Sequence, residues 1–130
     1  MAESIKPGLA GRSELVVARE STARHLGSGG VEVLATPELV RLMERAAVAA
    51  VDHLLPEGYR TVGARVDVPH LAPTPVGMRV VASAELVAVD GRRLTFQVEA
   101  HDERELVGRG SHERAIVELA RFAQRVEQKR

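Results

Sequence analysis

The stretch from Thr36 to Leu55, TPELVRLMERAAVAAVDHLL, constrains the fold more than any other part of the sequence. Thr followed by Pro is typical of a helix start, and Pro56 and Gly58 prevent the helix from continuing. A helix of this length is a rod about 28 Å long. Most of its polar side chains share one narrow arc; they are Glu38, Arg41, Arg45 and Asp52. Because the rest of its circumference is largely apolar, we expect one long helix around which the remaining chain wraps.

Glu44 breaks this pattern, because it falls in the apolar arc one turn from Val40 and from Val48. Such a carboxylate is either a partly exposed residue on the flank of the apolar arc or one that is paired with an arginine. The alternative is a carboxylate that faces a pocket, where burial tunes its charge state for acid–base or nucleophilic chemistry.

Residues 13–20 are a short strand candidate, and four further segments after the helix alternate apolar and polar residues as strands do: 61–70, 78–89, 94–100 and about 105–117. In the first of these four, Val62, Ala64, Val66 and Val68 are expected to share the buried face. His70 continues that parity beyond Pro69. Asp90-Gly91 predicts a tight hairpin. The spacing of Leu119, Phe122, Ala123 and Val126 predicts a short amphipathic helix at the C-terminus.

This order of elements predicts an α+β fold in which residues 1–130 form one domain. Consecutive antiparallel strands with one apolar face need an apolar cover, and the long helix can supply it. An antiparallel sheet wrapped around one long central helix is the hotdog fold. Because such a sheet leaves an edge strand exposed, we expect a homodimer paired edge to edge, with a tetramer of such dimers left open.

The composition excludes several classes of function. A chain of 130 residues with a formal net charge of zero gives no indication of a nucleic-acid or anionic-membrane partner. Cysteine is absent, so disulfides and thiolate metal sites are excluded. The sequence has no signal-peptide pattern and no apolar run of membrane-spanning length, so we expect a cytoplasmic location.

Residues 21–35 hold Gly27, Ser28, Gly29 and Gly30 and follow neither a helical nor a strand period. A loop of this length is either a functional lid or an inert connection. We call residues 21–35 the lid segment.

Sequence motifs that would define other enzyme classes are missing. The five histidines lack metal-ligand spacing, and neither GxSxG nor a dinucleotide-binding GxGxxG is present. His70 is either a core histidine or, with Glu44, half of an acid–base pair. Thr36 is either a helix cap only or also a group at the positive end of the helix dipole, which favours an oxyanion. Gly63, like other strand glycines, marks a bulge or offers a bare N–H to a carbonyl oxygen.

Several longer motifs resemble one known family. They are ATPELVRLMERA, VGARVDVPHLAPTPVGMRVVASAELVAVDGRRLTFQVEAHD and GRGSHERAIVELARF. From about Leu15 to Lys129 the chain is similar to the fluoroacetyl-CoA thioesterase family of hotdog proteins. The family's catalytic Thr, Glu and His fall on Thr36, Glu44 and His70. Its glycine beside the thioester falls on Gly63, and the arginine of its HER motif on Arg114.

The resemblance implies an acyl-CoA thioesterase that needs no cofactor, since coenzyme A is part of the substrate. Glu44 would be the nucleophile or general base, His70 its acid–base partner, and Thr36 would orient Glu44 by a hydrogen bond. Gly63 and Arg114 would contact the substrate.

The family's fluoroacetyl-specific member has phenylalanines in the lid segment, whereas GSGGVEVLA here has no aromatic residue. We therefore expect a different short or medium acyl group. Two alternatives remain: a hotdog dimer that binds acyl-CoA without turnover, and an enoyl-CoA hydratase.

Overall fold

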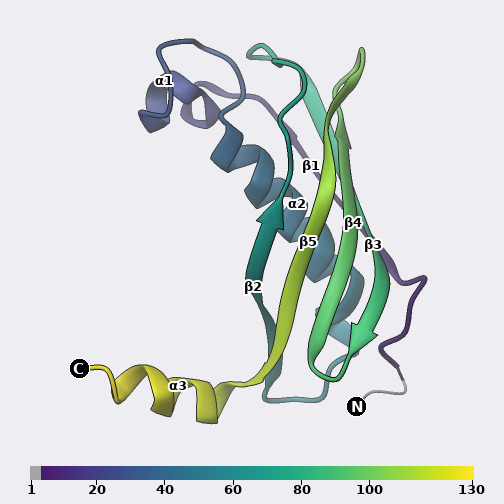
Figure 1. The fold of residues 1–130 in the computed structure, drawn as a ribbon. Helices are drawn as coiled ribbons and strands as arrows, with labels where there is room; N and C mark the ends of the chain where they lie inside the picture. The colour runs from purple at the N-terminus through teal and green to yellow at the C-terminus, as the bar shows by residue number, and fades with distance from the viewer. Residues whose placement is uncertain (1–3) are drawn as a thin grey trace.

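The structure, a computed structural model, describes residues 4–130. An antiparallel five-stranded sheet with the order β1-β3-β4-β5-β2 curls around one long helix, α2 (Figure 1). The strands are β1 (Ala10–Val16), β2 (Tyr59–Asp67), β3 (Arg79–Asp90), β4 (Arg93–His101) and β5 (Leu106–Glu118). The helices are η1 (Arg19–Ser21), α1 (Ala23–Leu26), α2 (Thr36–Val51), η2 (Asp52–Leu54) and α3 (Leu119–Glu127). This architecture confirms the predicted hotdog fold.

The predicted long helix forms, but its first turn differs from the prediction. Ala35 occupies the N-cap position and makes no side-chain capping bond, while Thr36 is the first helical residue. The expectation that Thr36 caps the helix is therefore wrong, because its hydroxyl bonds with His70 instead. At the C-terminal end α2 tightens into η2, which begins at Asp52.

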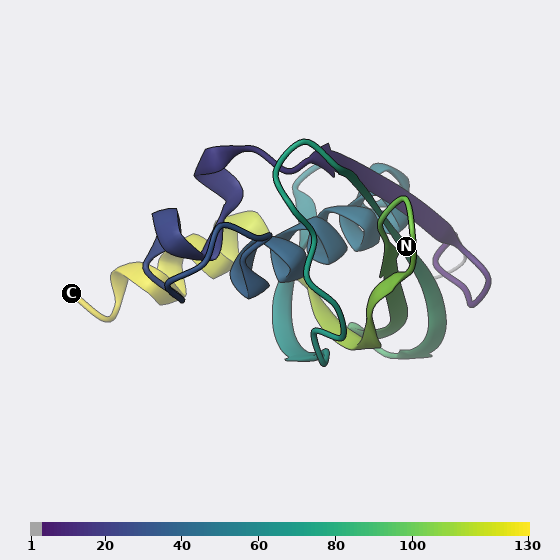
Figure 2. The same cartoon turned by 90° about the horizontal axis from the view of Figure 1, so that it is seen from above.

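The core is aliphatic, as the scarcity of aromatic residues requires. Most of the apolar positions that the alternation predicted in β3 and β4 are fully buried: Val80, Ala82, Ala84, Leu86, Leu94, Phe96, Val98 and Ala100. Ala88, predicted on the same face, is exposed, because the register shifts by a bulge between Leu86 and Ala88. The hairpin between these strands turns at Gly91, whose φ of 60° suits glycine. Seen from above, α2 lies within the curve of the sheet (Figure 2).

Two glycines let backbones approach each other closely. A Cβ atom on Gly11 of β1 would collide with the Ala46 carbonyl of α2, and one on Gly110 of β5 would collide with the Asp67 carbonyl at the end of β2. Gly11 thus brings the edge strand β1 against the helix, and Gly110 brings the chain after β2 close to β5.

The predicted buried face of β2 is wrong. Thr61 is buried, whereas Val66 is 41% exposed and Ala64 is also exposed. The register shifts by a bulge between Gly63 and Arg65. Before the bulge Thr61 and Gly63 pair with Ile116 and Arg114 and face α2, so Val62 faces outward. Beyond the bulge the parity reverses, and Val66 pairs with His112 on the inner face but stays exposed.

The lid segment contains the short helix α1, which Thr22 caps by accepting a hydrogen bond from the His25 N–H. An isolated bridge joins Thr22 to Leu34 within the segment, and another ties Val33 to Pro75 outside it. At the other end of the molecule α3 projects past β2 (Figure 1). Among residues 4–130, no helix has both the length and the apolar character that a membrane crossing requires.

Candidate active site

Glu44 lies midway along α2 with its carboxylate above Gly63 of β2. A Cβ atom at position 63 would stand 2.6 Å from Glu44 Oε2, so any larger residue there would require this carboxylate to move. The Glu44 side chain is 37% exposed and is paired with Arg114. Within one chain, Glu44 therefore matches the first of the two interpretations drawn from the sequence, a partly exposed carboxylate paired with an arginine.

Arg114 of β5 is buried and is held by hydrogen bonds on three sides. Its Nε donates to Thr61 Oγ1 at 2.8 Å, and its Nη2 donates to the Thr61 carbonyl at 3.0 Å. Its Nη1 donates to Glu44 Oε2 at 3.5 Å and to His112 Nε2 at 3.1 Å. A guanidinium fixed in this way presents its charge to Glu44 in one orientation.

Asp52 completes the support of Arg114 through Thr61. The Thr61 hydroxyl donates to Asp52 Oδ1 at 2.5 Å, and the Thr61 N–H donates to Asp52 Oδ2 at 3.2 Å. Because the Thr61 hydroxyl donates its proton to Asp52, the Thr61 oxygen is free to accept a hydrogen bond from Arg114. Arg114 therefore lies between two carboxylates: it contacts Glu44 directly and is linked to Asp52 through Thr61.

His112 is 1% exposed, and its surroundings fix its tautomer. Its Nδ1 lies 2.8 Å from the Arg65 carbonyl, which can only accept, so Nδ1 carries the proton. Its Nε2 then accepts from Arg114, which can only donate. Burial lowers the pKa of His112, and the neighbouring Arg114 charge lowers it further, against opposing contributions from the Arg65 carbonyl and from Glu44. His112 is thus neutral and orients the guanidinium.

Burial also lowers the pKa of Arg114, while the carboxylates of Asp52 and Glu44 oppose that shift. Arginine remains charged at neutral pH even so. Arg114 therefore places a permanent positive charge beside the Glu44 carboxylate.

Thr36 and His70 form a second cluster. Thr36 Oγ1 lies 2.8 Å from His70 Nδ1. His70 follows β2 and is held by an isolated bridge to Gly108 of β5. Burial lowers the pKa of His70, a backbone hydrogen bond to Ala72 opposing the shift. Its Nε2 is buried and has no hydrogen-bond partner within residues 4–130. A buried ring nitrogen without a partner is available to a bound ligand.

A cavity of about 340 Å³ adjoins this pair. Thr36 and His70 form part of its wall, and the lid segment supplies Ser28, Gly29, Val31 and Val33. The wall contains no phenylalanine, tyrosine or tryptophan. The lid segment thus covers a small, mainly aliphatic space next to the His70 imidazole.

Within one chain the two clusters are separate. Thr36 and Glu44 are eight residues apart on α2, which corresponds to about 12 Å along the helix axis. The Thr36 hydroxyl therefore contacts His70 and does not form the expected hydrogen bond with Glu44. The structure brings together Glu44, Gly63 and Arg114, and separately Thr36 and His70.

Sequence reasoning missed three residues of this site: Asp52, Thr61 and His112. In the sequence Asp52 is one of the polar residues of the helix arc. Thr61 has the parity opposite to the valines that were expected to be buried. His112 could have been found, because it shares the inward parity of Arg114 on the predicted strand.

Known proteins resemble this chain over most of its length. The family model of fluoroacetyl-CoA-specific thioesterases matches residues 17–120. A fluoroacetyl-CoA thioesterase of Streptantibioticus cattleyicolor is 38% identical over 135 residues, which cover 99% of this chain and 97% of the relative.

Solved structures support the same relationship. A mutant of a fluoroacetyl-CoA thioesterase in complex with acetyl-CoA is 38% identical with a TM-score of 0.90, over 96% of this chain and 98% of that one. A hot-dog-like protein from Thermanaerovibrio acidaminovorans is 29% identical with a TM-score of 0.90, over 98% of this chain and 95% of that one. The chain therefore belongs to the fluoroacetyl-CoA-specific thioesterase family of hotdog-fold thioester hydrolases.

Proposed function

We propose that this protein hydrolyses a short or medium acyl-CoA to the free acid and coenzyme A, with water as the only co-reactant. The observation that carries the proposal is the carboxylate of Glu44, which the buried Arg114 holds above a glycine on the strand that leads to His70. The proposal includes the cytoplasmic location predicted from the sequence.

In the proposed reaction the Glu44 carboxylate either takes a proton from water or attacks the acyl carbon itself. In the first route the water oxygen adds to the carbonyl carbon, the C–S bond breaks, and the thiolate of coenzyme A takes up a proton. In the second route Glu44 displaces the thiolate to form an anhydride, which water then hydrolyses. His70 Nε2 is the proposed proton donor to sulfur or hydrogen-bond donor to the carbonyl oxygen.

The separation of the two clusters favours a site shared between two copies of the chain. A thioester next to Glu44 is about two helical turns from Thr36 and His70 of the same chain. Pairing of the exposed edge strand β2 with its counterpart in a second copy would bring Glu44 of one copy toward His70 of the other. We therefore include a homodimer in the proposal, with Glu44 facing the Thr36–His70 pair of its partner.

The cavity that the lid segment covers indicates which acyl groups would fit. The cavity beside His70 is small and has no aromatic wall, so it offers room and aliphatic contacts without an aromatic surface that selects for fluorine. Short and medium unsubstituted acyl chains fit this description better than fluoroacetyl does.

The test is turnover of a panel of acyl-CoAs of increasing length, with thiol release as the readout. Glu44→Gln and His70→Ala are each expected to lower kcat at least about 100-fold, since general acid–base groups contribute that much or more. Both variants should still unfold cooperatively and keep the wild-type oligomeric state. Unchanged turnover in both variants contradicts the roles proposed here, and a wild type that binds acyl-CoA without hydrolysing it favours the binding-protein alternative.

A further inference from the structure

We propose that a groove beneath α3 binds the phosphate groups of the substrate's coenzyme A moiety, with Arg92 and Arg121 as the phosphate ligands. This inference rests on the proposed function and adds a subsite to it.

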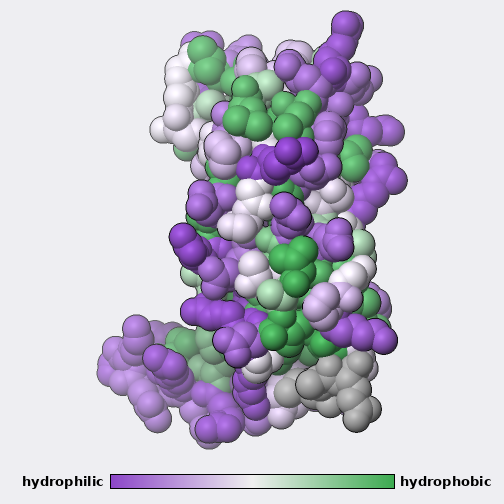
Figure 3. Space-filling model, turned by 45° about the vertical axis from the view of Figure 1, so that its right-hand side comes forward, coloured by the Kyte–Doolittle hydropathy of each residue, from purple (hydrophilic) through white to green (hydrophobic). Residues whose placement is uncertain are grey.

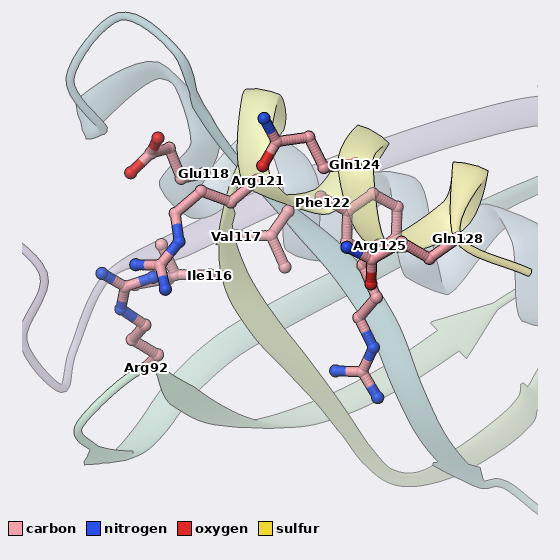
Figure 4. Close-up of a pocket in the computed structure, with 9 residues that line it drawn as sticks. All are labelled: Arg92, Ile116, Val117, Glu118, Arg121, Phe122, Gln124, Arg125 and Gln128. Atoms are coloured by element: carbon pink, nitrogen blue, oxygen red, sulfur yellow. The ribbon is translucent and has the colours of Figure 1, made fainter.

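The groove has a volume of about 360 Å³ and lies where β5 leaves the sheet and α3 begins. The β3–β4 turn contributes Arg92, the end of β5 contributes Ile116 and Val117, and α3 contributes Arg121 and Phe122 (Figure 4). None of the residues of α3 is buried. The helix therefore stands away from the sheet and leaves a hollow between them.

The lining of this groove has a net positive charge, because it contains Arg92, Arg121 and Arg125 and one carboxylate, Glu118. Figure 4 shows the guanidinium groups of Arg92 and Arg121 at the same end of the groove. Within residues 4–130, neither side chain lies within ion-pair distance of a carboxylate. Two guanidinium groups that share a hollow repel each other, and an anion between them removes that repulsion. A phosphate group suits this pair, because each planar guanidinium can donate two hydrogen bonds to its oxygens.

The remaining lining favours such a ligand. Arg92 lies over the ring of Tyr59, 5.9 Å from its centroid, which limits where the guanidinium can go. The carboxylate in the lining, Glu118, is within hydrogen-bond reach of the Tyr59 hydroxyl at 3.4 Å. Ile116 and Phe122 provide apolar contacts for the organic part of a nucleotide. Figure 3 shows hydrophobic side chains gathered beside the hydrophilic ones at this end of the molecule.

The groove lies at a suitable distance from the candidate active site. Ile116 has the same parity on β5 as Arg114, so the two side chains share the face toward α2 and stand about 7 Å apart along the strand. The paired positions Gly63–Arg114 and Tyr59–Glu118 are four residues apart, or about 13 Å. In an acyl-CoA the pantetheine arm separates the thioester from the phosphates by a comparable extended length. A thioester held at Gly63 can therefore place its phosphates in the groove.

The experiment compares two substrates that carry the same acyl group, the acyl-CoA and the acyl-pantetheine, which lacks the nucleotide phosphates. In the double variant Arg92→Gln/Arg121→Gln the KM for acyl-CoA is expected to rise at least about tenfold, with kcat within twofold of wild type. The KM for acyl-pantetheine should stay unchanged. Arg104→Gln removes the same charge from the exposed β4–β5 turn and is the matched control, with both KM values unchanged.

An unchanged KM for acyl-CoA, or an equal rise for both substrates, overturns the subsite. Calorimetric titration with coenzyme A and with pantetheine separates this inference from the proposed function. If wild type hydrolyses no acyl-CoA but binds coenzyme A more tightly than the double variant, the groove is supported and the proposed function fails.

Discussion

At the residue scale, the candidate site depends on how one guanidinium is held. Arg114 uses its donors on Thr61, His112 and Glu44, and each bond to such a charged group contributes about 1.5–3 kcal/mol. The bonds to Thr61 and His112 set the orientation from which Arg114 contacts Glu44. Asp52 acts on Glu44 only through this chain of contacts, since it bonds with Thr61.

The neutral state of His112 predicts a loss of stability in acid. Its pKa in the folded protein is below its ordinary value of 6.5, so as the pH falls the unfolded chain binds a proton before the folded protein does. The free energy of unfolding is therefore expected to fall as the pH drops below about 6.5. His70, whose pKa is also lowered, contributes in the same direction.

Urea denaturation at pH 7 and at pH 5 measures this effect. His112→Asn should lose less stability between the two values than wild type does, because it has no imidazole to protonate. His101→Asn, at an exposed position of β4, should follow the wild type and is the control. Equal losses in wild type and His112→Asn would show that His112 is not the acid-sensitive group.

Sequence reasoning identified the chemically unusual residues but not their partners. Glu44 could be predicted because a charge in an apolar helical arc is conspicuous within a single element. Its contacts with Arg114 and His112 join residues about 70 positions apart and depend on how β5 packs beside α2. The role of the Thr36 hydroxyl was missed for a similar reason, since its partner His70 follows a different element.

At the element scale, the alternation of apolar and polar residues predicted which strand positions are buried wherever one face of the strand packs on the core and the other faces solvent. The buried positions of β3 and β4 follow the pattern without exception from Val80 to Leu86 and from Leu94 to Ala100. The pattern failed on β2, an edge strand with a bulge, where Thr61 and Gly63 face the helix before the bulge and Val66 shares the inner face only beyond it. A period of two cannot show a bulge, because the extra residue reverses the parity beyond it.

The glycines of the sheet give a prediction at this scale. Gly110→Ala would place a methyl group against the Asp67 carbonyl, so β2 and β5 must separate where the chain turns toward His70. We expect a loss of about 1–3 kcal/mol in the free energy of unfolding. Gly30→Ala, where an added Cβ meets open space without a positive φ, should change stability by less than about 0.5 kcal/mol.

Chemical denaturation of the two glycine variants provides the comparison. A Gly110→Ala protein as stable as Gly30→Ala would mean that the close approach of these strands is not needed for the fold.

At the scale of the whole molecule, the edge strand β2 connects fold and function. It carries Gly63 next to Glu44, leads to His70 beyond its end, and has no strand neighbour on its outer side among residues 4–130. Val66 of this strand is 41% exposed, which suits contact with a second copy of the chain. In the proposed function such a second copy completes the site, with Glu44 and His70 contributed by different chains.

Mixing two inactive variants tests this claim most directly. Glu44→Gln and His70→Ala are unfolded together, refolded, and assayed for thiol release from an acyl-CoA that the wild type hydrolyses. Random pairing makes half of the dimers mixed, and each mixed dimer has one intact site of two, so activity should recover to about a quarter of wild type. No recovery in a sample whose mixed dimers are verified by mass spectrometry would contradict the shared site.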